Sequence, residues 1–243
     1  MPENMRMWIE VTFNVAYLVA VWGLVVAMWR RRPWVASADR PIADRFMAAF
    51  ALLALGDTGH VGLRVAAYAL GGLTAQPVLF GRPVSLVGLG ALATAYTVTL
   101  FYVLMLDIWR LRNGRRFAAF EYFLLALAVI RLGLMALPQN EWWRVDPIPP
   151  WNLIRNAPLT VMGLGIAYLI LRDARRAQDR VFTWIGGLIV VSYACYAPVI
   201  LFAAQAPLVG MLMIPKTLAY LAIAVVAFRT FYGRPAPALV APA

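Results

Sequence analysis

The chain has few of the residues from which metal sites and disulfides are built. It contains one cysteine, Cys195, and one histidine, His60, among 243 residues. A single cysteine cannot form a disulfide within the chain. A single histidine excludes a three-histidine zinc site and a haem held by two histidines of one chain. We therefore expect no metal, and no cofactor follows from these residues.

Charged residues are also scarce, and lysine is nearly absent. Asp, Glu, Lys and Arg together make up 14% of the chain, and Lys216 is the only lysine among 22 basic residues. The charges lie in short clusters between long apolar runs, 63% of the residues are hydrophobic, and the mean hydropathy is +0.74. This composition is typical of a membrane protein and excludes an ordinary soluble domain.

Seven apolar segments are long enough to cross about 30 Å of hydrocarbon as helices. They cover residues 7–29, 46–70, 84–109, 117–137, 153–171, 182–204 and 208–230. We predict an all-α fold in which residues 1–243 form one domain, a bundle of seven transmembrane helices, with a flexible tail at 233–243. The first segment is too long for the core of a signal peptide, and its arginines follow it, so we expect it to be retained.

The placement of the arginines predicts the orientation of the bundle. Cytoplasmic loops of membrane proteins carry an excess of positive charge. Most arginines follow the first, third, fifth and seventh segments, whereas the opposite side has little beyond Arg6, Arg82 and Arg144. We therefore predict an outside N-terminus and a cytoplasmic C-terminus in a cell membrane, specifically a bacterial inner membrane. The net charge of +11 then reflects topology, and we expect no nucleic-acid partner.

The second segment carries three polar residues on one stripe. Asp57, His60 and Arg64 are spaced at i, i+3 and i+7, which places them on one face of a helix. Such a stripe avoids lipid, so we expect it to face the bundle. It is either a self-paired network that stabilises the fold or a strip that contacts a ligand or responds to protons, since His60 can titrate near neutral pH.

Lys216 lies within the last apolar segment, directly after Pro215 and one turn before Tyr220. A lysine within a bilayer span is costly and indicates a functional site by default, and lysine can lose its proton when desolvated. Two other interpretations are that Lys216 extends to the membrane surface or forms a salt bridge with Asp57.

Further polar residues are predicted at the same outer depth. Arg155 and Asn156 lie in the first turns of the fifth segment, and Arg131 lies one to two turns below the same surface. Tyr193 and Tyr196 approach that surface on the sixth segment. Arg155 lies nearest the interface and could instead bind a phospholipid phosphate there.

These residues define a candidate ligand-binding site that is cationic on balance. The site consists of Asp57, His60, Arg64, Arg131, Arg155, Asn156, Tyr193, Tyr196, Lys216 and Tyr220. A cationic cavity among apolar helices suits an anionic or amphipathic small molecule or a lipid, bound through a carboxylate or phosphate. The leading hypothesis is a ligand-binding, sensor-like membrane protein that contacts membrane lipids and passes its signal to a protein partner.

Two features outside this site are predicted to be structural. Gly56, Gly59 and Gly62, and also Gly163 and Gly165, have spacings typical of closely packed membrane helices. The acidic residues of the inner half are expected to pair with loop arginines; they are Asp107 and Glu121, beside Arg110 and Arg116.

Other classes of function remain open. A small-anion transporter or channel would use the buried charges as a pathway, although no internal repeat is evident. An intramembrane enzyme would need Asp57 and His60 to act as an acid–base pair, because the three serines, Ser37, Ser85 and Ser192, are not in a nucleophile motif.

The lysine in the last of seven helices is similar to the arrangement in microbial rhodopsins, and Tyr193, Tyr196 and Pro198 resemble part of their sixth helix. The resemblance implies retinal bound to Lys216 as a Schiff base. The sequence departs from that family at two positions. Leu212 stands where those proteins have an aspartate, four residues before the lysine, and the third segment has no carboxylate at mid-membrane depth.

Overall fold

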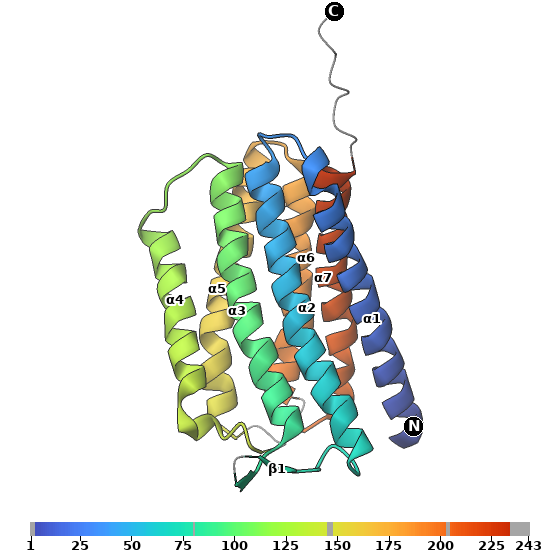
Figure 1. The fold of residues 1–243 in the computed structure, drawn as a ribbon. Coiled ribbons are helices and arrows are strands. Elements are labelled where there is room, and N and C mark those ends of the chain that lie inside the picture. Colours follow the sequence, from blue (N-terminus) through green and yellow to red (C-terminus); the bar gives the residue numbers. More distant parts are fainter. Residues whose placement is uncertain (1–2, 80, 145–147, 203–204, 234–243) are drawn as a thin grey trace, which may run out of the picture.

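The computed structural model describes residues 3–79, 81–144, 148–202 and 205–233. Seven α-helices run along one another as a single bundle (Figure 1). They are α1 (Glu3–Arg31), α2 (Arg40–Ala69), α3 (Leu86–Arg112), α4 (Ala119–Ala136), α5 (Trp151–Arg176), α6 (Arg180–Phe202) and α7 (Met213–Ala227). The seven predicted helices are confirmed, and each is long and apolar enough to cross a membrane, the last as the continuous helical span Leu208–Tyr232 that contains α7. The predicted flexible tail at 233–243 lies outside the described residues except for Gly233.

The last span is composite. A 3₁₀ segment, η3 (Pro207–Leu212), leads into α7, and a π-helical turn, η4 (Phe228–Tyr232), follows it. Short 3₁₀ turns η1 (Arg32–Trp34) and η2 (Pro138–Asn140) lie in two connections. Strands β1 (Val78–Leu79) and β2 (Arg82–Pro83) form an antiparallel hairpin between α2 and α3.

Several helices extend beyond their predicted ends because charged residues continue them. α2 begins at Arg40, six residues before the predicted start at residue 46, and Asp44 in its first turns pairs with Arg32 at 2.7 Å. α5 continues to Arg176, where Asp173 accepts a hydrogen bond from the indole of Trp109 at 3.0 Å. Ion pairs and hydrogen bonds thus allow helix to persist past the apolar run.

Several ion pairs lie at the end of the bundle that contains the C-terminus of α1 (top of Figure 1). We call it the arginine-rich end. Asp107 pairs with Arg45 at 3.0 Å and with Arg110 at 2.6 Å, which confirms its expected role. Glu121 differs from the expectation: its carboxylate accepts a hydrogen bond from the backbone N–H of Ala118 at 2.9 Å and so caps α4.

Aromatic side chains fill the core on this side of the bundle. Phe46, Phe50, Phe101 and Tyr102 are almost completely buried. The rings of Phe50 and Phe101 meet edge to face at 5.7 Å.

Glycines bring the helices close together where the sequence predicted it. A Cβ at Gly56 would collide with Thr97 on α3, and one at Gly163 would collide with Tyr193 on α6. A Cβ added at Gly59 would lie 3.2 Å from the Cβ of Ala93, and one added at Gly165 would lie 2.7 Å from the Leu124 side chain. Gly62 is different, since a Cβ there would meet no atom within 4 Å.

Candidate functional site

A cavity of about 460 Å³ lies among the helices toward the end where α1 begins. We call this end the cavity end (bottom of Figure 1). All seven helices contribute to its walls, and all ten residues of the predicted site line it. The structure therefore brings the predicted residues together, whereas their role in binding a ligand stays a prediction.

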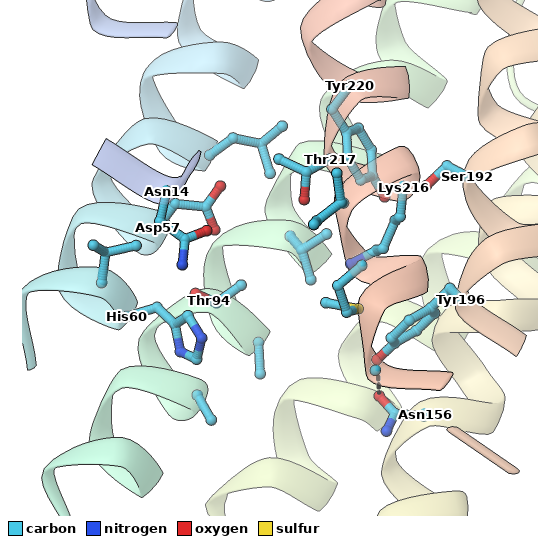
Figure 2. Close-up of a pocket in the computed structure, with 18 of the residues that line it drawn as sticks. Asn14, Asp57, His60, Thr94, Asn156, Ser192, Tyr196, Lys216, Thr217 and Tyr220 are labelled. Atoms are coloured by element: carbon cyan, nitrogen blue, oxygen red, sulfur yellow. Dashed lines mark hydrogen bonds between the residues drawn. The ribbon is translucent and has the colours of Figure 1, made fainter. Parts of the chain in front are cut away.

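One side of the cavity is formed by α1, α2 and α3 and carries the acidic group (Figure 2). Asp57 accepts a hydrogen bond from the hydroxyl of Tyr17 at 3.0 Å. His60 lies one turn further along α2, and its buried Nδ1 has no hydrogen-bond partner among the described residues. The close approach of α2 and α3 depends on Gly90, whose Cβ would lie 2.9 Å from the Cα of His60.

The opposite side is cationic and is built around Asn156 of α5. The Oδ1 of Asn156 accepts hydrogen bonds from the Tyr196 hydroxyl at 3.2 Å and from Nη2 of Arg131 at 3.5 Å. Arg131 is only 2% exposed, and its Nε and Nη1 have no partner among the described residues. A buried guanidinium with two unused donor nitrogens is costly unless another group reaches it.

Arg155 belongs to the same side but is held by the segment between α4 and α5. Its Nη1 donates to Asn140 at 3.4 Å, and its guanidinium lies 4.1 Å from the ring centre of Trp142. The Trp142 indole donates to the carbonyl of Met135 at 2.9 Å. Arg155 is 8% exposed, so the structure buries it beneath Trp142 rather than presenting it to lipid headgroups at the surface.

Lys216 completes the cationic side. Its Nζ lies 4.3 Å from the centre of the Tyr196 ring and 5.7 Å from that of Tyr220, which are cation–π distances. Within the described part of the chain, no carboxylate lies within 4.0 Å of the Nζ of Lys216, so the alternative interpretation of a salt bridge between Lys216 and Asp57 is wrong. α7 begins at Met213, which places Pro215 in its first turn and not in the middle of a long helix.

Tyrosines close the cavity on the side of the aromatic core. The Tyr220 and Tyr102 hydroxyls are hydrogen-bonded at 2.8 Å, and Tyr193 donates to the carbonyl of Leu159 at 2.9 Å. Tyr193 and Tyr220 are 4% and 6% exposed. They therefore form a hydrogen-bonded floor of the cavity. Because their hydroxyls already hydrogen-bond to protein groups, fewer of these hydroxyls are available to a ligand than the sequence predicted.

Several cavity residues were not predicted from the sequence. They are Tyr17, Thr94, Trp142, Ser192, Met211, Met213 and Thr217. Trp142 lies in the connection between α4 and α5, whose tryptophans and prolines predict a lid or rim but do not show which of its side chains faces the cavity. Tyr17 and Thr94 could not be found, because the order of helices in the bundle does not follow from one sequence.

The polar groups of this cavity suit hydrogen bonding to an anion better than metal coordination. Among the residues that the structure describes, no group of three or more His, Cys, Asp or Glu side chains could hold a metal ion. The chain matches no protein-family model, no curated protein and no solved structure.

Proposed function

We propose that this chain is a multi-pass membrane protein that binds an anionic or amphipathic small molecule or a lipid in the cavity. The observation that carries the proposal is Arg131, a guanidinium that is 2% exposed, lines the cavity and has two nitrogens without partners among the described residues. An anionic group from a ligand would satisfy those donors and recover part of the desolvation cost.

Orientation belongs to the same proposal. We propose that the arginine-rich end faces the cytoplasm of a bacterial cell, because cytoplasmic loops carry an excess of positive charge, and that the cavity opens toward the outside. Sensing is favoured over transport because the side beyond the tyrosine floor is packed with Phe50, Phe101 and Met105, each at most 1% exposed. A signal would then pass to a protein partner.

The test uses dodecyl phosphate, with dodecanol as the uncharged control, and protein in a neutral detergent. A ligand that binds the folded state raises the unfolding temperature as its concentration increases. We expect dodecyl phosphate to do this, and Arg131→Gln to weaken its binding about tenfold or more.

Arg110→Gln is the matched control, because Arg110 pairs with Asp107 at the arginine-rich end. It should leave the affinity unchanged. Equal stabilisation by dodecanol, or equal affinity of the Arg131 variant, would contradict the proposal.

A second candidate, a retinal-type chromophore protein, is favoured by one observation. The Lys216 ammonium contacts the Tyr196 and Tyr220 rings and has no described ion pair. Its amine, once deprotonated, could condense with the aldehyde of retinal with loss of water. Added retinal should then produce visible absorbance in the wild type and none in Lys216→Arg; absence of absorbance in both rejects this candidate.

A further inference from the structure

We propose that the ligand carries a free hydroxyl group in addition to its anionic group, and that this hydroxyl binds between Asp57 and Lys216. The inference rests on the proposed function, since it specifies the chemistry of the molecule bound in the same cavity. Its central observation is an acid and an ammonium that share one cavity without forming an ion pair.

Asp57 and Lys216 project into the same space from opposite walls (Figure 2). Their charged atoms are not within the 4.0 Å of a salt bridge. Each side chain instead has another contact: Asp57 accepts a hydrogen bond from the Tyr17 hydroxyl at 3.0 Å, and the Nζ of Lys216 lies 4.3 Å from the centre of the Tyr196 ring. Asp57 and Lys216 therefore share the cavity at more than 4.0 Å from each other, and the proposal places a small polar group of the ligand between them.

The chemistry of the two side chains restricts what that group can be. An ionised carboxylate only accepts hydrogen bonds, and an ammonium only donates them. A ligand ammonium would satisfy Asp57 but repel Lys216, whereas a second carboxylate would do the reverse. A hydroxyl donates one hydrogen bond and accepts others, so it can bridge both residues in the place that a water molecule would take.

The anionic group of the same ligand has its own partners. Arg131 offers Nε and Nη1, both without described partners, next to the Asn156 and Tyr196 pair. The cavity of about 460 Å³ is large enough for a headgroup with part of a chain. The ligand class is therefore a hydroxylated anion, such as a phosphate ester with free hydroxyls, supplied either as a lipid headgroup or as a free metabolite.

Matched probes that differ in their hydroxyls test this inference. In the lipid arm, dioleoyl phosphatidylglycerol is compared with dioleoyl phosphatidylmethanol, because both carry one negative charge and only the first has free hydroxyls. In the soluble arm, glycerol 3-phosphate is compared with propyl phosphate. Native mass spectrometry measures the lipid affinities, and calorimetry the soluble ones. We expect the hydroxylated member to bind about tenfold to a hundredfold more tightly in at least one arm.

Variants locate the hydroxyl. Asp57→Ala should reduce the ratio of the affinities for the hydroxylated and unhydroxylated probes to about one. Asp107→Ala, the same change at the arginine-rich end, should leave this ratio as in the wild type. Unfolding temperatures verify that both variants fold; if Asp57→Ala does not, the comparison of probes on the wild type still decides. A preference that persists in folded Asp57→Ala overturns the placement of the hydroxyl.

The remaining outcomes separate this inference from the proposed function. A preference in one arm only identifies the lipid or the soluble anion as the source and supports the inference. If the two members of each probe pair bind with equal affinity, and Arg131→Gln weakens that binding, the inferred hydroxyl site is overturned while the proposed anion site stands. If no probe binds, both proposals are overturned.

Discussion

Arg131 and Arg155 are neighbouring arginines with different energetic roles. Arg155 is hydrogen-bonded to Asn140 and stacked on Trp142, whereas two nitrogens of Arg131 have no partner among the described residues. A buried charge without partners opposes folding, because its desolvation is not offset by hydrogen bonds. The protein retains Arg131 at a cost in stability, which is typical of residues selected for function.

This difference predicts opposite effects of the same substitution. Arg131→Met should leave the unfolding temperature of the ligand-free protein unchanged or raise it, because an apolar chain of similar length removes an unpaired charge. Arg155→Met should lower the free energy of unfolding by about 1–2 kcal/mol through lost hydrogen bonding and stacking. Thermal unfolding in detergent measures both, and a large destabilisation by Arg131→Met would show that Arg131 is a structural residue.

At the arginine-rich end, burial decides the value of an ion pair. Asp173 is 3% exposed and accepts hydrogen bonds from Trp109 and Arg172, whereas Asp44 and its partner Arg32 are 25% and 49% exposed. Asp173→Asn should therefore cost about 1–3 kcal/mol of stability, and Asp44→Asn about 1 kcal/mol or less. Denaturant titrations of both variants make the comparison, and equal costs would contradict it.

Among the elements, the connection between α4 and α5 packs against the start of α3, and Gly88 of α3 leaves the space for it. We call the part of this connection around Trp142 and Trp143 the cap. The backbone N–H of Ser85 donates to the carbonyl of Trp143 at 2.9 Å, and a Cβ at Gly88 would collide with the carbonyl of Trp142. Because the obstructing atom is backbone, the whole segment must shift to admit a methyl group. The position of Trp142 over Arg155 thus depends on a residue in another helix.

Gly88→Ala should displace this cap. We expect a loss of about 1–3 kcal/mol in the free energy of unfolding, as for other overpacked sites, together with weaker binding of dodecyl phosphate because Arg155 loses its support. Gly133→Ala on α4 is the control, since a Cβ there meets nothing within 4 Å, and alanine favours helix over glycine by about 1 kcal/mol. If both variants retain wild-type stability and affinity, the cap is not held as described.

The sequence predicted the helices well because apolar length alone identifies a membrane span. It did not predict their ends, since the pairing of Asp44 with Arg32 and the contact between Asp173 and Trp109 depend on tertiary structure. It also missed the β1–β2 hairpin, in which two-residue strands carry no periodic signal. The 3₁₀ segment before α7 was hidden for a similar reason, because it is as apolar as the helix.

The sequence predicted at which level along the bundle axis the residues of the candidate site lie, but not which of them face one another across the bundle. Helical period and chain direction placed Asp57, Arg131 and Lys216 at one level, and the structure has all three in one cavity. Which side chains face one another depends on helix order, so the contact of Tyr17 with Asp57 had no signal in the sequence. The Arg155–Trp142 contact was hidden in the same way, because it requires the connection to fold back over α5.

The whole molecule divides along the bundle axis into two chemically different ends. Asp57, Arg131 and Lys216 line the cavity and form no ion pair with one another. At the arginine-rich end, Asp107 and Asp179 pair with Arg45 and Arg112. Opposite charges are thus paired at the arginine-rich end, whereas these three cavity residues are not paired with one another, which is the difference on which the proposed binding of an anion depends. Which end faces outward determines the source of that ligand.

Single-cysteine labelling tests the orientation. In a background with Cys195→Ser, we place one cysteine at Gln76, between α2 and α3, or at Ala177, between α5 and α6; both positions are exposed. The arginine distribution predicts that a membrane-impermeant maleimide labels Gln76→Cys in intact spheroplasts and Ala177→Cys only after lysis. Neither substitution changes a charge, so the topological signal is preserved. The reverse pattern would place the cavity toward the cytoplasm, and the hydroxylated anion would then have to come from inside the cell.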